Sequence, residues 1–585
     1  MFFALFTLWF IRETKAILFW FYLWQLKEYH IGRFLDHFRT EKGKRLLFNK
    51  LLILKIFLFS FALFSFYFLP IFRNVIIMSW HFYYVFWLLI VILYCLETIK
   101  ALKDFLQKNL KKPILTKKTA ILISAALIFQ FLFLLVLIQV AQQIFLFISG
   151  LLILDILTPA ITSAIVLFFQ PFAVLGRNQI IKKAKEKRAQ FQDLLVIGIT
   201  GSYGKTATKE FLATILSERF NGSAGSPQRV LKTAEHQNSE VGISQCILND
   251  LKPGHEIFIC EMGAYNRGGI KLLCDIAKPK IGILTGINEQ HMATFGSQEN
   301  IVKGKYELIK SLPEDYNPPA TLPPQRAPGL AIFNGDNEYC FELYKKTLIK
   351  KRVYGLQSSI SGLPSDIWAY NIRAEKDFIT FKVAAGDEIV DFKVNLMGSQ
   401  NVSNVLAAAI CARELGMTLE EISRACQKIE SWQSGFQLKK GINGLNIIDA
   451  TYSANPDGVI SHLEYLKIWP GKKIIVMPCL IELGRASEEV HKRIGRKIGE
   501  VCDLAIITTK ERFEEIVEGA RLRQGFGGRE IKKDNILFLE SPKEIFEKIK
   551  SFCNPDDLVL LESRVPSQLI RQLTSNHVLL NTRAQ

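Results

Sequence analysis

The stretch Gly198-Ile199-Thr200-Gly201-Ser202-Tyr203-Gly204-Lys205-Thr206 decides how this chain is organised. An apolar run, Leu194 to Ile197, precedes it and predicts a buried strand. Residues 207–216 follow it, with apolar side chains spaced for one face of a helix. A strand, a glycine turn, Lys-Thr and a helix are typical of a loop that cradles a polyphosphate, because glycines let backbone N–H groups approach the phosphates. We therefore expect Lys205 to reach the terminal phosphates and Thr206 to hold Mg²⁺.

The loop departs from the strict phosphate-loop pattern at one position. That pattern places a glycine six residues before the lysine, and this chain has Ile199 there. The alternative is an ordinary glycine-rich turn whose lysine is solvated. The flanking strand and helix favour the nucleotide site, with Gly201, Ser202 and Gly204 supplying the remaining contacts to ATP.

Composition limits the class of protein. The 585 residues are 49% hydrophobic and suffice for three or four domains. The ten cysteines form no CxxC pair, which indicates neither a zinc site nor a disulfide framework. Of the net charge of +18, most lies in residues 1–190, with 24 Lys and Arg against 8 Asp and Glu; the rest carries 49 against 47. Because the basic excess belongs to the apolar third, we expect no nucleic-acid partner.

The first third predicts a membrane region. Four apolar segments are each long enough to cross a hydrocarbon layer that takes about 20 helical residues: 51–72, 75–96, 119–140 and 145–170. Residues 1–24 are also apolar but carry Arg12, Glu13 and Lys15, which are costly at mid-bilayer. We therefore predict an interfacial or re-entrant segment there, with a fifth crossing as the alternative.

The charges of the connecting segments predict the orientation. Residues 25–50, 97–118 and 171–190 are rich in Lys and Arg, and basic loops stay in the cytoplasm. We expect a multi-pass protein of the cell membrane whose residues from 171 onward are cytoplasmic. Arg177 to Arg188 predicts a basic helix lying against anionic membrane lipid. The region is either a plain anchor or a device that holds or senses a lipid-linked substrate.

Three polar residues stand at predicted ligand-facing positions of the soluble part. Glu261 ends an apolar strand that begins at Glu256, and a carboxylate at that end of a strand lies over the ligand crevice, where it can hold Mg²⁺. His291 follows the strand 281–284 and is either structural or functional. Asn238 either borders the substrate or belongs to a helix cap.

The spacing of strands and helices predicts the fold class, which is α/β with parallel sheets. A multi-helix transmembrane region occupies 1–190. A phosphate-loop α/β ATPase domain follows at 191–436, including short strands over 351–395. A C-terminal Rossmann-like α/β domain occupies 437–585.

Seven segments, in order, resemble the Mur ligase family, the ATP-dependent amide ligases of peptidoglycan synthesis. They are TGSYGKTATKE at 200–210, NSEVG at 238–242, EMGA at 261–264, GINEQHMATFGS at 286–297 with Lys305 after it, GSQNVSN at 398–404, DATYSANP at 449–456, and IELG at 481–484 with His491. The nearest branch adds a D-alanyl-D-alanine dipeptide.

The resemblance implies roles for individual residues. Glu261 and His291 become Mg²⁺ ligands beside Thr206. Lys305 becomes a carbamoylated lysine, which makes Lys205, Lys305 and His291 the catalytic set. The resemblance also implies that Asn334 contacts the nucleotide base. It implies that Asn455 and its neighbour Asp449 line the site of the incoming amine.

The resemblance also implies the reaction. ATP phosphorylates a carboxylate of a cell-wall precursor, and the amine of an amino acid or dipeptide displaces phosphate from the acyl phosphate. One alternative is an ATP-binding relative with reduced activity or a different acid substrate. An ATP-driven transporter is less favoured, because the predicted spans are few and no LSGGQ-type signature is present.

Three positions depart from the family pattern. Ala450 replaces an aspartate, Gln400 replaces a histidine, and residues 431–444 hold Lys439 and Lys440 where the family has an arginine. Lys439 can substitute as a point charge but not as a bidentate fork. The membrane third also stands where the family has its UDP-binding domain, so a membrane-bound acceptor is an alternative to a UDP-linked one.

Overall fold

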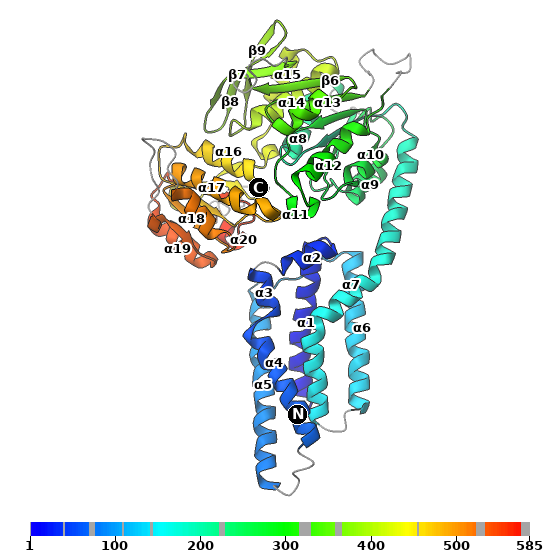
Figure 1. Cartoon of the computed structure of the whole chain (residues 1–585), viewed down its shortest axis with the longest axis vertical. Coiled ribbons are helices and arrows are strands. Elements are labelled where there is room, and N and C mark those ends of the chain that lie inside the picture. The colour runs from blue at the N-terminus through cyan, green and yellow to red at the C-terminus, as the bar shows by residue number, and fades with distance from the viewer. Residues whose placement is uncertain are drawn as a thin grey trace, which may run out of the picture. The chain divides into compact units, whose positions relative to one another are not determined.

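The chain forms two compact units, Met1–Arg177 and Asn178–Gln585. The computed structural model describes residues 2–38, 41–68, 76–107, 110–140, 144–221, 228–314, 329–356, 365–452, 455–521 and 533–574. The first unit is helical and the second is α/β (Figure 1).

The first unit is a bundle of long helices joined by short ones (Figure 1). Its helices are α1 (Phe2–Leu26), α2 (Ile31–His37), α3 (Glu41–Leu47), α4 (Lys50–Phe68), α5 (Ile76–Leu106), α6 (Lys117–Val140) and the first part of α7 (Ile144–Ala189). Within the described residues, four stretches are long and apolar enough to cross a membrane: Gly43–Phe64, Val85–Leu106, Lys117–Val140 and Leu146–Ala189. They correspond to the four predicted segments, of which residues 69–72 and 75 lie outside the described part of the chain.

The helix α1 is one continuous helix of 25 residues that packs against α5 and α6. It is not among the four stretches of the described residues that are long and apolar enough to cross a membrane, so the interfacial segment and the fifth crossing both stay predictions. Trp9 and Phe21 are fully buried, and Trp24 is 2% exposed. The ionisable residues that argued against this placement face inward, where they find partners.

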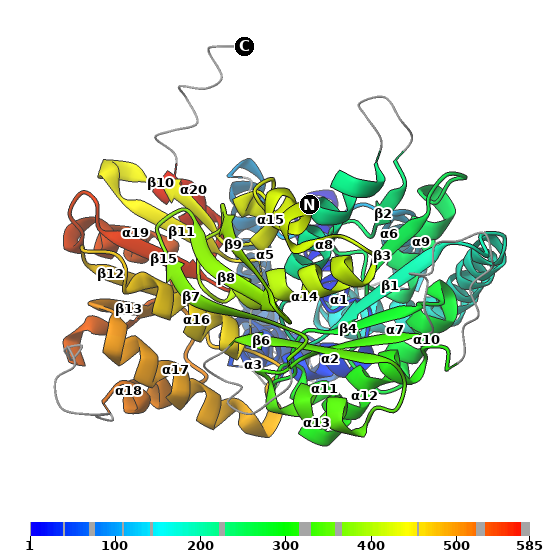
Figure 2. The ribbon, with the colours of Figure 1, turned by 90° about the horizontal axis from the view of Figure 1, so that it is seen from above.

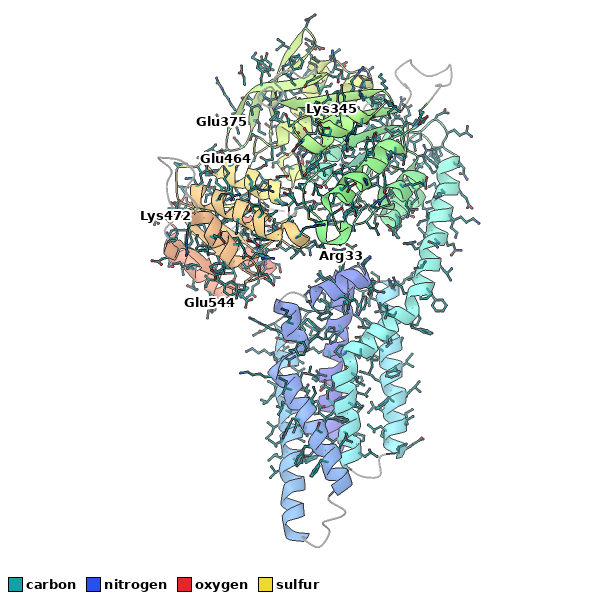
Figure 3. The ribbon with its side chains drawn as sticks, in the orientation of Figure 1. Arg33, Lys345, Glu375, Glu464, Lys472 and Glu544 are labelled. Atoms are coloured by element: carbon teal, nitrogen blue, oxygen red, sulfur yellow. The ribbon has the colours of Figure 1, made fainter. Side chains whose placement is uncertain are left out.

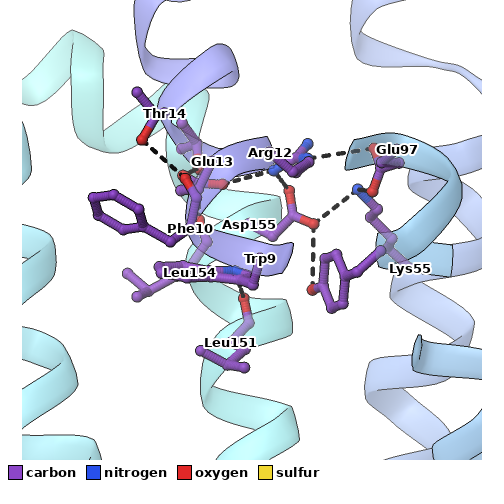
Figure 4. A network of polar contacts seen from close by, with 12 residues as sticks. Trp9, Phe10, Arg12, Glu13, Thr14, Lys55, Glu97, Leu151, Leu154 and Asp155 are labelled. Atoms are coloured by element: carbon purple, nitrogen blue, oxygen red, sulfur yellow. Dashed lines mark hydrogen bonds and ion pairs between the residues drawn. The ribbon is translucent and has the colours of Figure 1, made fainter. Parts of the chain in front are cut away.

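Those partners form a network of five charged side chains from four helices (Figure 4). The Arg12 guanidinium contacts Glu13 at 2.6 Å and Glu97 at 3.3 Å, and it also pairs with Asp155. The Lys55 ammonium lies 2.6 Å from Glu97 and 2.8 Å from Asp155. Removing one partner of such a buried set costs about 3–5 kcal/mol, because it leaves the others unpaired in an apolar interior. The network therefore ties α1 to α4, α5 and α7.

The larger sheet of the second unit has nine strands in the order β2-β3-β1-β4-β5-β6-β7-β8-β9. They are β1 (Leu195–Thr200), β2 (Val230–Lys232), β3 (Ile257–Glu261), β4 (Ile281–Leu284), β5 (Leu330–Asn334), β6 (Lys351–Leu356), β7 (Ile367–Ala374), β8 (Ile379–Ala385) and β9 (Glu388–Val394). The pairs from β2 to β7 are parallel, and β8 and β9 add antiparallel edge strands. The carboxyl ends of β1, β3 and β4 therefore meet at one edge.

Helices cover both faces of this sheet (Figure 2). They are α8 (Lys205–Phe220), α9 (Glu240–Asn249), α10 (Gly269–Ala277), α11 (Met292–Phe295), α12 (Gln298–Lys310), α13 (Glu338–Lys346), α14 (Asn401–Glu414) and α15 (Leu419–Cys426). The helices α8 and α14 share one core with the sheet, and α9, α10 and α12 share the other. Phe211, Leu212, Ile215 and Leu216 on α8 are fully buried, as predicted, each stabilising the fold by about 1.5–3 kcal/mol relative to exposure.

The smaller sheet has six strands in the order β10-β11-β15-β12-β13-β14. They are β10 (Gln437–Lys440), β11 (Asn446–Ala450), β12 (Lys473–Met477), β13 (Leu504–Ile507), β14 (Ile536–Phe538) and β15 (Leu558–Glu562). The helices around it are α16 (Pro456–Leu466), α17 (Ser487–Val501), α18 (Phe513–Arg521), α19 (Pro542–Phe552) and α20 (Ser567–Thr574). All its pairs are parallel except β10 with β11. The parallel sheet expected from residue 437 onward is thus present, with β10 and β14 as additions.

The end of α7 corrects two expectations. The units divide inside α7, not at residue 190, because Ile181 and Ala184 belong to a core of the second unit. Arg188, predicted to lie against lipid, is 6% exposed. Its guanidinium donates to the carbonyls of Ala277, Phe191 and Leu194. It therefore holds the entry to β1 in place.

Candidate active site

The phosphate loop joins β1 to α8 through a tight turn. Gly204 precedes α8 with a left-handed φ of 76°, and a Cβ there would lie 2.5 Å from the Asn404 side-chain oxygen. Ser202 N–H donates to the Gly286 carbonyl at 2.6 Å. Glycine is therefore required at 204, and the loop is braced against the end of β4.

Lys205 lies across its own loop. Its ammonium donates to the carbonyls of Gly201 at 2.8 Å and Ser202 at 3.2 Å. Burial lowers the pKa of Lys205, and the Glu261 carboxylate opposes that shift. The Lys205 ammonium thus lies at the loop that the sequence predicts to bind a polyphosphate.

The carboxylate of Glu261 gathers polar groups around the start of α8. Its position follows from the register, because Glu261 on β3 pairs with Ile199 on β1. Thr206 donates its hydroxyl to Glu261 Oε2 at 3.0 Å, and Asn238 donates its amide to Glu261 Oε1 at 3.0 Å. The Lys209 ammonium lies 3.7 Å from Oε2. Three of the predicted residues, Thr206, Glu261 and Asn238, therefore lie together.

This group of oxygen donors fits Mg²⁺. Mg²⁺ in nucleotide sites takes one or two carboxylates plus phosphate oxygens and water, so a hydroxyl and a carboxylate 3.0 Å apart are a suitable protein share. Among the described residues, no three His, Cys, Asp or Glu side chains gather as a metal site. The arrangement therefore suits a cation held jointly with a nucleotide, not an all-protein cage.

His291 has one ring nitrogen committed to a carboxylate of the C-terminal domain. Its Nδ1 lies 2.7 Å from Glu482 Oε2, and its ring meets the edge of Tyr265 with centroids 4.7 Å apart. Burial lowers the pKa of His291, Glu482 opposes this, and the charges of Lys305 and Lys205 lower it further. Sequence reasoning did not give Glu482 a role, although it lies in the quoted IELG stretch.

Lys305 is a buried amine with an unusual pKa. It lies on α12 and is 2% exposed, and its ammonium is 3.5 Å from the Ala264 carbonyl. Burial lowers the pKa of Lys305 to about 7, and the positive charge of Lys205 contributes. The positive charge of Lys205 thus acts on both Lys305 and His291.

Asn334 ends β5 and has its side chain committed within the protein. Its amide donates to the Thr285 carbonyl at 2.8 Å and contacts the Ser403 hydroxyl at 3.4 Å. Its side-chain oxygen accepts from Asp336 N–H at 2.9 Å. A nucleotide base that binds the Asn334 side chain must therefore replace one of these hydrogen bonds.

The two C-terminal candidates have local partners. Asp449 pairs with the Lys439 ammonium at 2.6 Å and accepts from the Thr451 hydroxyl at 2.6 Å. Lys439 is thus placed as a point charge. Asn455 caps α16, since its side-chain oxygen accepts from Gly458 N–H at 2.8 Å.

Two segments of the chain match known protein families. Residues 199–412 match the Mur ligase middle domain, and residues 436–564 match the Mur ligase glutamate ligase domain. The chain belongs to the Mur ligase family. Its members include ATP-dependent ligases, and residues 1–198 of this Mur ligase lie outside both matches.

Three relatives share one name, UDP-N-acetylmuramoyl-tripeptide–D-alanyl-D-alanine ligase. The Bacillus subtilis protein is 27% identical over 380 residues, 64% of this chain and 75% of that protein. The Escherichia coli protein is 28% identical over 51% of this chain, and the Synechocystis protein 31% over 52%. This chain spans only 61% and 59% of those two proteins.

Two solved structures share the fold. MurF from Acinetobacter baumannii matches with a TM-score of 0.56 at 23% identity, over 68% of this chain and 81% of that one. MurF ligase from Thermotoga maritima in complex with ADP also gives 0.56, at 24% identity, over 70% of this chain and 85% of that one. The Mur ligase α/β fold is therefore present, with the helical unit additional to it.

Proposed function

We propose that this Mur ligase uses ATP to join D-alanyl-D-alanine, or a similar amine, to a peptidoglycan precursor. The observation that carries the proposal is the cluster of Thr206, Glu261 and Asn238 beside Lys205. It supplies hard oxygen ligands and a cation at the mouth of a phosphate loop, in a chain with both Mur ligase domains. The similarity to named D-alanyl-D-alanine ligases supports the choice of amine.

In the proposed reaction, an oxygen of the precursor carboxylate attacks the γ-phosphorus of ATP and ADP leaves. The amine nitrogen then attacks the acyl carbon, phosphate leaves, and the nitrogen loses a proton. Bound Mg²⁺ would neutralise charge on the phosphates. Lys205 would stabilise the transferring phosphoryl group, and Thr206 and Glu261 would hold the cation.

The acceptor requirement tests this function. Purified full-length protein should release phosphate from ATP only when a precursor and D-alanyl-D-alanine are both present, because each substrate is consumed in a coupled reaction. UDP-linked and lipid-linked tripeptide precursors, assayed side by side, identify the acceptor. Phosphate release that needs neither substrate contradicts the ligase and supports an ATPase of another kind.

We also propose that the first unit is embedded in the cell membrane, with the ligase domains in the cytoplasm. The four long apolar stretches support this proposal. Large apolar side chains on them are exposed and could face lipid, for example Phe57 on α4 at 65% and Phe131 on α6 at 62% exposure. Many large apolar side chains of this unit are exposed, whereas the second unit presents exposed charges such as Lys345, Glu464 and Glu544 (Figure 3). The basic connecting segments support the cytoplasmic orientation.

The contacts of α1 extend this proposal to a fifth crossing. Arg12 and Lys15 meet Glu97 and Asp104, so α1 runs parallel to α5. Gln25, near the end of α1, bonds with Ile114, just before α6. A helix of 25 residues is about 37 Å long, which exceeds the hydrocarbon thickness. The start of α1 therefore lies on the side opposite the basic segments.

Accessibility of the termini tests this topology. In intact spheroplasts, a protease added outside should remove an epitope tag at the N-terminus and leave a tag at the C-terminus. Loss of both tags only after lysis contradicts the fifth crossing. Extraction of the protein by alkaline carbonate contradicts membrane embedding altogether.

A further inference from the structure

The two domains of the second unit meet at two turns that each follow a strand. The turn after β4 carries His291, and the turn after β12 carries Glu482. Their side chains are 2.7 Å apart and are 21% and 14% exposed, respectively. The backbones also bond, because Ala293 N–H donates to the Glu482 carbonyl at 3.0 Å.

Both residues hold an uncommon backbone conformation. His291 has φ 67° and Glu482 has φ 65°, which L-residues other than glycine seldom adopt. Such strained conformations persist where the surroundings hold them in place, often at functional sites. Gly484 allows the close approach, since a Cβ there would lie 3.2 Å from Ala293 N.

Two further contacts hold the same turn of the middle domain. The Asn288 amide donates to Asp457 at 2.9 Å, and the Arg493 guanidinium contacts both oxygens of Glu289 at 3.2 and 3.3 Å. Asn288 N–H also donates to the Ser202 hydroxyl of the phosphate loop at 3.2 Å. The C-terminal domain therefore contacts the turn after β4, and this turn is hydrogen-bonded to the phosphate loop.

We propose that Glu482 is a positioning residue of the active site. Its carboxylate accepts the Nδ1 proton of His291, which leaves the lone pair on Nε2 free for a divalent cation. A histidine that ligates a metal commonly donates its other ring N–H to a carboxylate, which sets the tautomer and the ring orientation. The metal part of this inference rests on the proposed function.

This assignment makes the metal site depend on both domains. Glu482 belongs to the C-terminal domain and His291 to the middle domain, so the metal-binding tautomer is set only when the two turns are docked.

The tautomer can be measured without turnover. The full chain, labelled with ¹⁵N-histidine and reconstituted in nanodiscs without nucleotide, contains nine histidines. His291→Gln identifies the signal of His291. We expect a protonated Nδ1 and an unprotonated Nε2 in the wild type, and loss of this pattern in Glu482→Ala. Glu488→Ala, which removes an exposed carboxylate at 58% exposure, should leave it unchanged. A protonated Nε2 in the wild type overturns the proposal.

Metal affinity gives an independent measurement. Binding of Mn²⁺ in the presence of a non-hydrolysable ATP analogue, followed by EPR, should weaken about 10- to 100-fold in Glu482→Ala. Glu482→Gln keeps the volume and an acceptor oxygen, so it should bind more tightly than Glu482→Ala and serves if the alanine variant does not fold. Unchanged Mn²⁺ affinity in a folded Glu482→Ala overturns the inference. Failure of every acceptor in the ligation assay, with these two results intact, would instead contradict the proposed function.

Discussion

Replacement of Lys205 by alanine should abolish nucleotide turnover, with kcat falling about 10³-fold or more. The ammonium lies at the phosphate loop, bonded to the carbonyls of Gly201 and Ser202. When a phosphoryl group transfers, negative charge develops on its oxygens, and a preorganised cation in a site with little water stabilises that charge. Lysine neutralises it as a point charge, so alanine leaves the transition state without that stabilisation.

The measurement is phosphate release with both substrates present. Lys303→Ala is the matched control, because Lys303 is 54% exposed on α12 and pairs with Glu299. This control should keep wild-type kcat. The fold should survive Lys205→Ala, since the lost bonds join groups within one loop, and a thermal melt verifies this. Wild-type turnover in a folded Lys205→Ala protein would contradict the assignment of the loop.

Lys305→Ala should lose most activity, and a small carboxylate such as acetate should restore part of it. The pKa of Lys305 is lowered to about 7 by burial, with a contribution from Lys205. About half of this amine is therefore neutral at pH 7, whereas an ordinary lysine with a pKa near 10.4 is neutral in well under 1% of molecules. Only a neutral amine can add CO₂; it releases a proton and becomes an anionic carbamate.

The sign of the pH effect follows from that pKa. The neutral form of Lys305 increases as the pH rises through 7, so CO₂-dependent activation should be strongest above pH 7 and fade below it. The experiment compares kcat in CO₂-free buffer and in bicarbonate between pH 6 and 8.5. Lys310→Ala, which removes an exposed lysine of the same helix, is the control. Full activity of Lys305→Ala, or no response to CO₂, contradicts the carbamate.

The phosphate loop and the residues at the strand ends were predictable because they follow local rules. A glycine turn followed by Lys-Thr between an apolar strand and a helix is typical of a phosphate loop, and parallel strands bring their carboxyl ends to one edge. That is why Thr206 and Glu261, which are distant in sequence, were expected near one cation and do lie together, whereas the contact of Asn238 with Glu261 was not expected.

The position of α1 was not predictable in the same way. Taken singly, Arg12, Glu13 and Lys15 argue against a helix among apolar neighbours. Their partners, Glu97 and Asp155, lie on helices that only tertiary packing brings to them.

By itself, the sequence determined the family, the phosphate loop and the alternation of strands and helices, since each depends on neighbouring residues and their periodicity. The tertiary structure alone decided which charges are neutralised inside the bundle and which residue of the C-terminal domain meets His291. Glu482 shows the physical reason: its contact joins positions 191 residues apart. Such a contact depends on how two separately folded sheets dock, and no local pattern in either one encodes it.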